Sequence, residues 1–572
     1  MRCAVRRSPF VAVGLLLCVV ATILAGCQTS TAKPKPTALP DSQQILRAPL
    51  VGQKDVSGLD PATVSNANSL AIMSLIYPGL VTLNANQQVI PWAADGLPDI
   101  SEDGLTYTFH VRAGLKWSDG TPINAQTFAY SLNRALSPCV NSPVNYYLFG
   151  LKDAVSFFTT GRCASDGVTV EGPLTTLIGD ALKVTDQQTL EIVLAQPAAY
   201  FLDTLSYPVA YAVPQQTITK YGSDWTKHLA DGSGLGGSLY MLTAWPHNGT
   251  LTLTRNPNFW GANPLLREID YTFYPTADNE YAAWQADKSD VGYAPTTQYP
   301  SASAAKDFHE TGMLNLYYFA MSWTEAPFNN LLARQAFALA LDKQAIATDV
   351  LKNTVIPTNH IVPQGMPGYN AALRGPDGST HLTGDPAIAT KYGQQYANVA
   401  CHGKFATCAT VVLTIPSGQS WLTSVANTAV AAWKKALPGW PISIRAVDQR
   451  TLLQQLGNRQ PQLWLFNWLG DYPDPQDWLS LQFLPGSDNN IGNVTVDQAN
   501  TLMLKADAEV DPLQRMRDYN AAEQLLVVNI AWIPLYQTKV WWQTKPTVRN
   551  YALTSFGLTS LDVWPTIYIA AA

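Results

Sequence analysis

Strand-like and helix-like periodicity alternate along this chain, and no segment repeats. Residues 105–112 ("LTYTFHVR") and 249–256 ("GTLTLTRN") alternate apolar and polar side chains, as half-buried strands do. Residues 333–351 and 511–529 have the apolar spacing of helices, whereas residues 375–403 show little periodicity and predict a surface loop. The interspersed elements favour a mixed α and β fold. Because 572 residues exceed what one hydrophobic core usually organises, we expect two or three lobes.

The N-terminus predicts export and a lipid anchor. Three arginines precede an apolar run that ends in "LAGC" at residues 24–27, the order of regions in a secretory signal peptide, here residues 1–26. A retained transmembrane helix is the alternative, but the apolar run is short for one. The ending resembles the bacterial lipobox, which implies that Cys27 carries a lipid and anchors the chain outside the cytoplasm on the cell membrane. Residues 27–45 are rich in Thr, Pro, Ser and Lys and predict an extended tether.

Four cysteines remain after the signal peptide and the lipidated cysteine are set aside. An even number is typical of disulfides in an oxidising compartment, and proximity in the sequence favours Cys139 with Cys163 and Cys401 with Cys408. The alternative is a metal site in "CHGKFATC", where His402 follows the first cysteine. That spacing matches no zinc pattern and lacks a fourth ligand, so we expect no metal.

Composition and motifs argue against nucleic-acid binding and catalysis. The net charge is −6, and the 36 Lys and Arg are scattered rather than gathered in a basic stripe. The seven His form no pair at metal-ligand spacing, and neither a P-loop nor a nucleophile elbow occurs. "GSGLGG" at residues 232–237 matches a dinucleotide-binding pattern, but no strand precedes it, so we interpret it as a flexible linker. We therefore expect neither an enzyme nor a cofactor.

Five ordered segments carry a family resemblance. In the most specific one, "TFHVRAGLKWSDGTP", an alternating strand, a turn and a helix start coincide. The five segments are residues 59–80, 107–136, 253–260, 327–346 and 468–479. They resemble the family 5 extracellular solute-binding proteins, the dipeptide-, oligopeptide- and nickel-binding receptors of ABC importers. The resemblance extends from about residue 46 to the C-terminus.

The resemblance implies a periplasmic-binding-protein-like fold of the Venus-flytrap type. Two α/β lobes in a class II-like arrangement would enclose the ligand by hinge closure, and the peptide-binding members have an additional third domain. We expect the chain to act as a monomer. Transferred to this numbering, lobe I comprises residues 46–80, 195–310 and 536–572, the additional domain comprises residues 81–194, and lobe II comprises residues 311–535.

"WLGDYPDP", from Trp468 to Pro475, places two carboxylates among aromatic residues and prolines. An ammonium group that is enclosed between lobes needs an opposite charge at hydrogen-bonding distance. In peptide-binding relatives the aspartate of the W-x-x-D-Y pattern holds the amino terminus of the ligand, which implies this role for Asp471. The other residues of this pattern that we predict to contact the ligand are Trp468, Gly470 and Tyr472.

The second carboxylate of the stretch has a structural interpretation. Asp474 lies between two prolines and is expected to cap a helix that opens at Gln476, with Asp477 in its first turn. The alternative for Asp471 is a similar role, as a turn or cap residue without a ligand.

The resemblance also implies contacts outside this stretch. Ser65, Asn66 and Ala67 match a segment whose backbone pairs with an extended peptide, a contact that is independent of side chains. Tyrosines in "NYYLFG" and "LYYFA" match aromatic walls, although such residues are often core residues instead. These wall positions are Tyr146 or Tyr147 and Tyr317 or Tyr318.

The chain departs from the family in two places. Ser238 replaces a glycine that usually precedes an aromatic residue, and no cation for a peptide carboxyl terminus is evident near Leu456 or Leu465. Ligand length and recognition of the carboxyl terminus therefore stay open.

The favoured function is a lipid-anchored receptor that binds peptides and hands them to the membrane permease subunits of an ABC importer. The alternative is an envelope lipoprotein of this fold with a regulatory or scaffolding role. Oligosaccharide, nickel and haem are rival ligands, of which nickel is disfavoured because no His cluster is present.

Overall fold

The computed structural model describes residues 37–571, except residues 65 and 248. The predicted signal peptide, Cys27 and the first part of the predicted tether lie outside the described residues. The chain already joins the fold before residue 45, because Ala38 forms a β-bridge with Ala570 and the Leu39 amide donates to the Ile569 carbonyl at 2.9 Å. The end of the tether therefore lies nearer to the N-terminus than residue 45.

Two long antiparallel strands, β14 and β19, run through the sheet that organises the C-terminal half of the chain. The strand order is β13-β19-β14-β18-β16-β17, and β15 pairs with β19. Alternate side chains of β14 enter different clusters, Phe319 and Met321 on one face and Tyr318 and Ala320 on the other, so both faces are buried. The strands are β13 (Val291–Gly292), β14 (Phe308–Met321), β15 (Val355–Pro357), β16 (Val411–Pro416), β17 (Ile442–Val447), β18 (Leu463–Leu469) and β19 (Ile533–Thr544).

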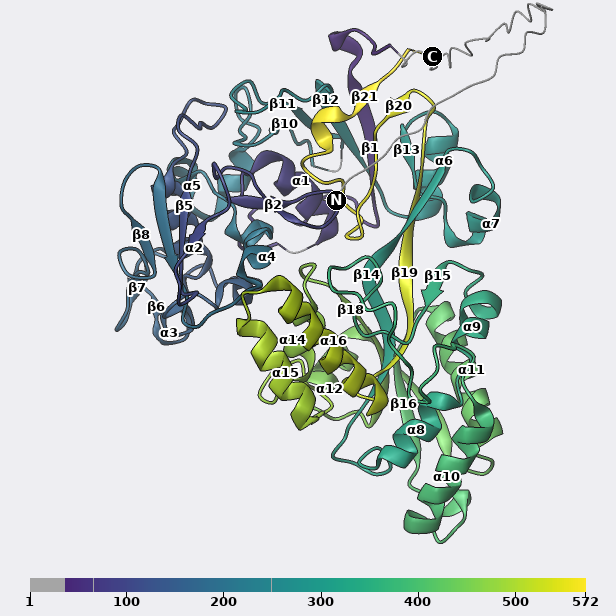
Figure 1. Ribbon diagram of the computed structural model, residues 1–572. Helices are drawn as coiled ribbons and strands as arrows, with labels where there is room; N and C mark the ends of the chain where they lie inside the picture. The colour runs from purple at the N-terminus through teal and green to yellow at the C-terminus, as the bar shows by residue number, and fades with distance from the viewer. Residues whose placement is uncertain (1–36, 65, 248, 572) are drawn as a thin grey trace, which may run out of the picture. The chain divides into compact units, whose positions relative to one another are not determined.

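Helices cover both faces of this sheet (Figure 1). The face of Phe319 packs against α8 (Leu331–Leu339), α10 (Pro386–Ala400) and α11 (Ser420–Ala436). The face of Tyr318 packs against α12 (Gln449–Gly457), α14 (Ser480–Phe483), α15 (Asp497–Ala508) and α16 (Pro512–Val528). Each helix buries an apolar stripe, which is the usual reason that short helices are stable in a protein.

Of the two predicted helices, one is confirmed and the other is interrupted, and one predicted loop contains a helix instead. Residues 511–529 form α16, in which Asp511 accepts hydrogen bonds from the amides of Leu513 and Gln514. The predicted helix over 333–351 is interrupted after α8, because Asp342 caps a new start by accepting from the Ala345 amide. The predicted loop over 375–403 contains α10, whose buried residues have helical spacing but are mostly small, so the hydrophobic period is weak. They are Ala389, Gly393, Tyr396 and Ala397.

Two four-stranded sheets lie in the N-terminal half, and the predicted strands at 105–112 and 249–256 are confirmed as parts of them. They share one hydrophobic cluster, in which Phe109 of β5, Leu253 of β11 and Leu46 of β1 are fully buried. The first sheet has the order β1 (Ile45–Val51), β12 (Glu268–Tyr274), β11 (Leu251–Arg255) and β10 (Tyr240–Ala244). The second has the order β4 (Asp99–Ile100), β5 (Thr106–His110), β9 (Thr189–Val193) and β8 (Leu182–Val184).

The other described helices are α1 (Ala67–Ile76), α2 (Ala125–Ala135), α3 (Ala154–Thr160), α4 (Phe201–Leu205), α5 (Gln215–Tyr221), α6 (Ala277–Gln285), α7 (Tyr299–Ala302), α9 (Lys343–Ala345) and α13 (Pro475–Trp478). The other described strands are β2 (Val81–Leu83), β3 (Val89–Pro91), β6 (Arg162–Cys163), β7 (Val170–Glu171), β20 (Val548–Arg549) and β21 (Tyr568–Ile569).

The glycine-rich stretch at 232–237 is not the flexible linker that its composition predicts. Its second half is buried, and a Cβ on Gly237 would lie 2.7 Å from the Trp117 ring. Ser118 donates to the Gly234 carbonyl at 3.1 Å and accepts from the Gly236 amide at 3.1 Å. The glycines thus allow close backbone packing. The next residue, Ser238, accepts a hydrogen bond from the Trp92 indole at 3.1 Å.

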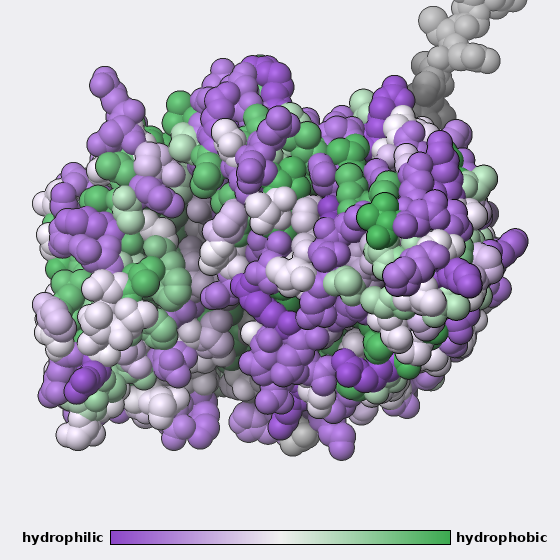
Figure 2. Space-filling view, turned by 90° about the horizontal axis from the view of Figure 1, so that it is seen from below, coloured by the Kyte–Doolittle hydropathy of each residue, from purple (hydrophilic) through white to green (hydrophobic). Residues whose placement is uncertain are grey.

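Figure 2 shows one face of the molecule, on which hydrophobic residues lie in patches separated by hydrophilic ones. Among the helices of the described residues, none has both the length and the apolarity that a bilayer crossing requires.

Both predicted disulfides are confirmed. They join Cys139 to Cys163 and Cys401 to Cys408. Cys401 is also the C-cap residue of α10, so the second disulfide fixes the end of that helix to the loop that follows it.

Replacing Cys139 and Cys163 by serine should destabilise the protein more than replacing Cys401 and Cys408. The sequence separations are 24 and 7, for which loop-closure entropy gives about 3.5 and about 2.4 kcal/mol. Thermal unfolding of the two double variants without reductant measures the order of their Tm values. Equal Tm values, or the reverse order, would show that loop entropy does not set the effect.

Candidate ligand-binding site

The turn after β18 places Asp471 at the surface of a cavity. Its backbone amide donates to a carboxylate oxygen of Asp477 at 3.0 Å, and the Gly470 amide donates to the Leu314 carbonyl at 2.7 Å. A Cβ on Gly470 would lie 3.0 Å from the Trp478 ring, so a larger residue here would displace the turn. The backbone of the turn is thus held from behind, and the Asp471 side chain is left for other contacts.

Asp477 lies in the first turn of α13, as predicted, and is fully buried. Besides the Asp471 amide, it accepts from the indole nitrogen of Trp468 at 3.2 and 3.3 Å. Burial raises the pKa of the Asp477 carboxyl well above its ordinary value, and the nearby charge of Asp471 adds to the rise. The polar edge of Trp468 therefore faces this carboxyl behind the turn.

Asp474 is the N-cap of α13, which confirms the sequence prediction. It accepts from the Gln476 amide at 2.9 Å. It also forms a bidentate ion pair with Arg515 of α16, with N–O distances of 2.5 and 2.6 Å, in which the side chains are only 5% and 8% exposed. No local pattern indicates this partner, because Arg515 lies on a helix 41 residues away from Asp474.

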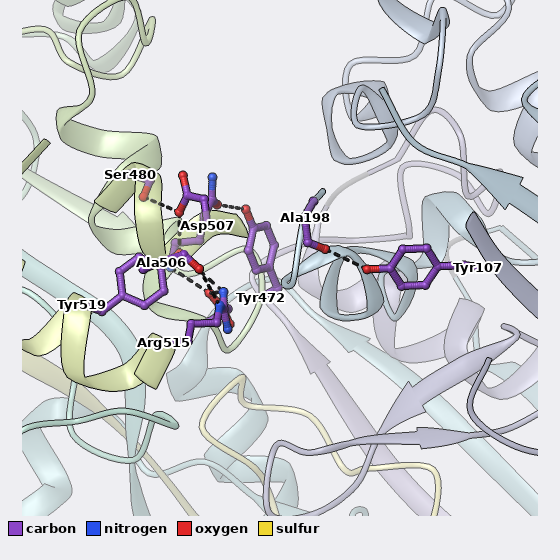
Figure 3. Close-up of polar contacts among 10 residues, drawn as sticks. Tyr107, Ala198, Tyr472, Ser480, Ala506, Asp507, Arg515 and Tyr519 are labelled. Atoms are coloured by element: carbon purple, nitrogen blue, oxygen red, sulfur yellow. Dashed lines mark hydrogen bonds and ion pairs between the residues drawn. The ribbon is translucent and has the colours of Figure 1, made fainter. Parts of the chain in front are cut away.

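The ion pair is part of a larger polar cluster (Figure 3). Arg515 donates to the Ala506 carbonyl at 3.2 Å. Tyr519 and Ser480 both donate to Asp507, at 2.5 and 2.7 Å. Burial raises the pKa of Asp507 to about 6. The cluster connects α14, α15 and α16 to the turn that carries Asp471.

The carboxyl of Asp471 contacts tyrosines from a distant part of the chain. The hydroxyl of Tyr146 donates to its Oδ2 at 3.2 Å, across 325 residues of sequence. Burial raises the pKa of Asp471 to about 6, although hydrogen bonds from Tyr147 and Tyr146 oppose the rise. Asp471 is therefore a half-buried carboxyl group, and a cation that approaches it would stabilise its ionised form.

The cavity beside Asp471 has a volume of about 410 Å³. Its walls come from α1, the β2–β3 hairpin, two aromatic segments, the turn after β18 and a C-terminal loop. Among the described residues that line it, Asp471 is the only one with a charged side chain. The lining residues are Ala67, Leu70, Ser74, Thr82, Leu83, Asn84, Gln87, Pro143, Val144, Tyr146, Tyr147, Ser206, Tyr207, Pro208, Tyr211, Leu469, Gly470, Asp471, Thr554, Phe556, Leu558, Thr559, Ser560 and Leu561.

Stacked tyrosines form one wall of this cavity. Tyr146 stacks on Tyr147 with ring centroids 4.5 Å apart, and Tyr147 stacks on Tyr207 at 4.2 Å. Tyr472 is buried and meets Tyr147 edge to face at 6.1 Å, so it supports the wall without lining the cavity. Stacking fixes the rings and so fixes the hydroxyl that reaches Asp471.

The predicted backbone segment is only partly described. Ser65 lies outside the described residues, whereas Ala67 lines the cavity at the start of α1. Asn66 caps α1, because its side chain accepts from the Ser69 amide at 3.0 Å. Ala67 and Gly470 thus bring two predicted segments, more than 400 residues apart, to the same cavity.

The two tyrosines of β14 lie elsewhere. Tyr318 is buried and stacks on Trp532 at 3.6 Å, so it is a core residue and the wall prediction is wrong for it. Tyr317 points to the other face and lines a second cavity of about 190 Å³, together with Asn467 of β18 and Gln419. The alternation of side chains along β14 decides between these neighbours.

Sequence reasoning missed much of the cavity wall. Tyr207 and Tyr211 come from "SYPVAY", and residues 554–561 come from a C-terminal loop without a motif. Only the local density of aromatic residues and prolines at 206–211 could have indicated the first segment. The described residues contain no group of three His, Cys, Asp or Glu side chains that could hold a metal ion.

A family model matches most of this chain. The model of the bacterial extracellular solute-binding proteins, family 5, matches residues 88–490. The curated relatives include the oligopeptide-binding protein OppA of Bacillus subtilis, 25% identical, with 85% of this chain and 86% of the relative covered. They also include the periplasmic oligopeptide-binding protein OppA of Escherichia coli, at 26% identity with 93% and 94% covered. A third, the probable deoxycholate-binding periplasmic protein YgiS of Escherichia coli, is 27% identical, with 89% and 91% covered.

Solved structures show the same fold. The unliganded open form of the periplasmic murein tripeptide-binding protein MppA has a TM-score of 0.77, with 22% identity and 94% of this chain and 99% of that chain covered. Haemophilus influenzae OppA in complex with RPPGFSPFR has a TM-score of 0.67, with 20% identity and 93% and 100% covered. The expected α/β, two-lobe, class II-like binding-protein fold is thereby confirmed.

Replacing Tyr146 by phenylalanine should raise the pKa of Asp471 above about 6, because a hydrogen bond to the ionised carboxylate is lost. The titration can be followed by the carboxyl ¹³C shift of labelled aspartate, assigned by difference from Asp471→Asn. Tyr211→Phe is the matched control, since Tyr211 lines the same cavity but donates to the Ser206 carbonyl at 2.8 Å. An unchanged pKa in Tyr146→Phe would mean that this hydrogen bond does not form in solution.

Replacing Arg515 by methionine should lower the free energy of unfolding by about 3–5 kcal/mol, because Asp474 stays buried without its partner. Arg517→Met in the same helix is the control and should change stability by less than about 0.5 kcal/mol, since Arg517 is exposed and its hydrogen bonds to Gln514 lie at the surface. Denaturant unfolding measures both. Similar losses in the two variants would contradict a special role for the buried pair.

Proposed function

The chain belongs to the family 5 bacterial extracellular solute-binding proteins, and we propose that it binds peptides by their amino terminus at Asp471. This is a family of binding proteins rather than enzymes. The observation that carries the proposal is a half-buried carboxyl group, the one charged side chain among the described residues around an otherwise uncharged cavity. A peptide ammonium that leaves water needs such a partner.

The backbone of the ligand would be held by both sides of the cavity. Ala67 at the start of α1 and Gly470 in the turn after β18 line it, and both offer main-chain groups. Pairing of a peptide with protein backbone is independent of the peptide's side chains, so many sequences would be accepted. The stacked tyrosines Tyr146, Tyr147 and Tyr207 would supply an apolar surface for the first side chain. The names of relatives, which include oligopeptide-binding proteins, support a peptide ligand.

The proposed transport role depends on movement between two lobes. We assign the predicted domain boundaries at residues 310/311 and 535/536 to the first residues of β14 and of β19, which would act as the crossing strands. β14 has a register shift between Gly312 and Leu316, where such a pair can bend. The additional domain would be residues 81–194, which contain β4, β5, β8 and β9. Closure on the peptide would precede its transfer to the permease subunits of an ABC importer.

The lipid anchor on Cys27 is also proposed. A diacylated cysteine would hold the monomeric receptor at the cell membrane, and the residues between it and the folded part would let the receptor reach the permease. An export signal is consistent with the two disulfides, which are typical of proteins outside the cytoplasm.

Asp471→Asn should lower the affinity for peptides with a free amino terminus by about tenfold to a hundredfold at pH 7. The reason is that a hydrogen bond between charged groups is worth about 1.5–3 kcal/mol. The same peptides with an acetylated amino terminus should bind weakly to both proteins. A library screen first identifies peptides that raise the Tm of the protein. Isothermal titration of these peptides then measures the affinities. The control is Asp488→Asn, because Asp488 is exposed in the same half of the chain.

The same titration has a predicted pH dependence. Burial raises the pKa of Asp471 to about 6, so at pH 5 only about a tenth of it is ionised and affinity should be about tenfold lower than at pH 7. Asp471→Asn should lose this dependence. If no peptide raises the Tm, peptide binding is wrong and the scaffolding role gains support. If Asp471→Asn weakens free and acetylated peptides equally, Asp471 has a structural role.

A further inference from the structure

The cavity beside Asp471 provides a negative charge but no positive one. Its described lining contains no Lys, Arg or His, and its polar groups apart from Asp471 are hydroxyls, amides and backbone. A ligand that carries both an ammonium and a carboxylate would therefore meet a partner for only one of its charges. Its carboxylate would also lie near the carboxylate of Asp471, and two like charges at short range repel.

The second cavity gives the far end of a ligand no cation either. It is lined by Leu465, Phe466 and Asn467 of β18 with Tyr317. Its polar side chains are amides, such as that of Gln419, and hydroxyls. Asn467 precedes Asp471 by four residues, a distance of roughly 13 Å if the chain is extended. A ligand that follows β18 for this distance would thus still meet uncharged groups.

The arginine behind the site is not free to receive an anion. Arg515 is 8% exposed and is held by both oxygens of Asp474 and by the Ala506 carbonyl. Lys505, on the neighbouring α15, is 2.9 Å from Asp518. The charges of Arg515 and Lys505 are therefore neutralised by carboxylates, and neither residue lines the cavity.

Given the proposed function, we infer that the site selects ligands with one positive charge and an apolar body, and that a negative charge close to the ammonium lowers affinity. For peptides this means a carboxyl terminus that is blocked as an amide, or one that lies several residues from the amino terminus. The specificity follows from the single charge at Asp471 together with uncharged walls such as Tyr146, Tyr207 and Leu558. Anionic amphiphiles are expected to be excluded, although one relative is named as a probable deoxycholate-binding protein.

The test compares one dipeptide of apolar residues in three forms: free acid, carboxyl-terminal amide and amino-terminal acetyl. Isothermal titration at pH 7 and low salt should rank the amide about tenfold above the free acid, with the acetyl form weakest. In Asp471→Asn the ratio of amide to free acid should fall toward one, because the repelling charge is gone. Asp488→Asn should keep the tenfold ratio.

Peptide length is the second arm of the test. The ratio of amide to free acid should shrink as residues are added, because each moves the carboxylate roughly 3.3 Å farther along an extended chain. A free acid that binds as tightly as the amide, or more tightly, at dipeptide length would overturn the inference while leaving peptide binding intact. Binding of deoxycholate without binding of any peptide would overturn the inference and the proposed function together.

Discussion

The buried ion pair between Asp474 and Arg515 is the contact on which the geometry of the cavity depends. Removing two charges from water costs several kcal/mol for each, so such a pair is retained only where geometry and hydrogen bonds are good. Here Arg515 meets both oxygens of Asp474, and Asp474 also accepts from the Gln476 amide. Because Asp474 follows Asp471 by three residues, the pair fixes one end of the turn. Asp477 fixes the other end through the Asp471 amide.

The position of Asp471 balances two opposing effects. Burial disfavours its charge, whereas the hydroxyl of Tyr146 stabilises that charge, and the resulting pKa of Asp471 is about 6. A carboxyl group at this balance changes protonation readily when a cation arrives. The same environment explains selectivity, since a cavity that already disfavours one negative charge disfavours a second one more. Stability and specificity therefore depend on neighbouring carboxyl groups of the same turn, Asp474 and Asp471.

Local patterns predicted much of the fold and failed where packing or a cap overrode them. The alternating strands β5 and β11, the capped helix α16 and both disulfides were predictable, because each depends on neighbours in the sequence. α10 was missed because its buried face consists largely of alanine and glycine. The composition of residues 232–237 predicts a linker, but the missing side chains of Gly234, Gly236 and Gly237 permit close packing against β10 and Trp117. Tyr317 and Tyr318 could not be ranked, because the orientation of β14 in its sheet decides which of them enters the core.

The sequence by itself determined which residues could do chemistry and which local elements form. The turn "WLGDYPDP", the cap at Asp474 and the periodicity of the strands and helices all follow from residues within a few positions of one another. Only the tertiary structure decided what surrounds Asp471, since Tyr146 lies 325 residues away and the C-terminal loop comes from the other end of the chain. The charge of the cavity is likewise a tertiary property. It depends on which side chains are absent from the walls, and no local pattern encodes that.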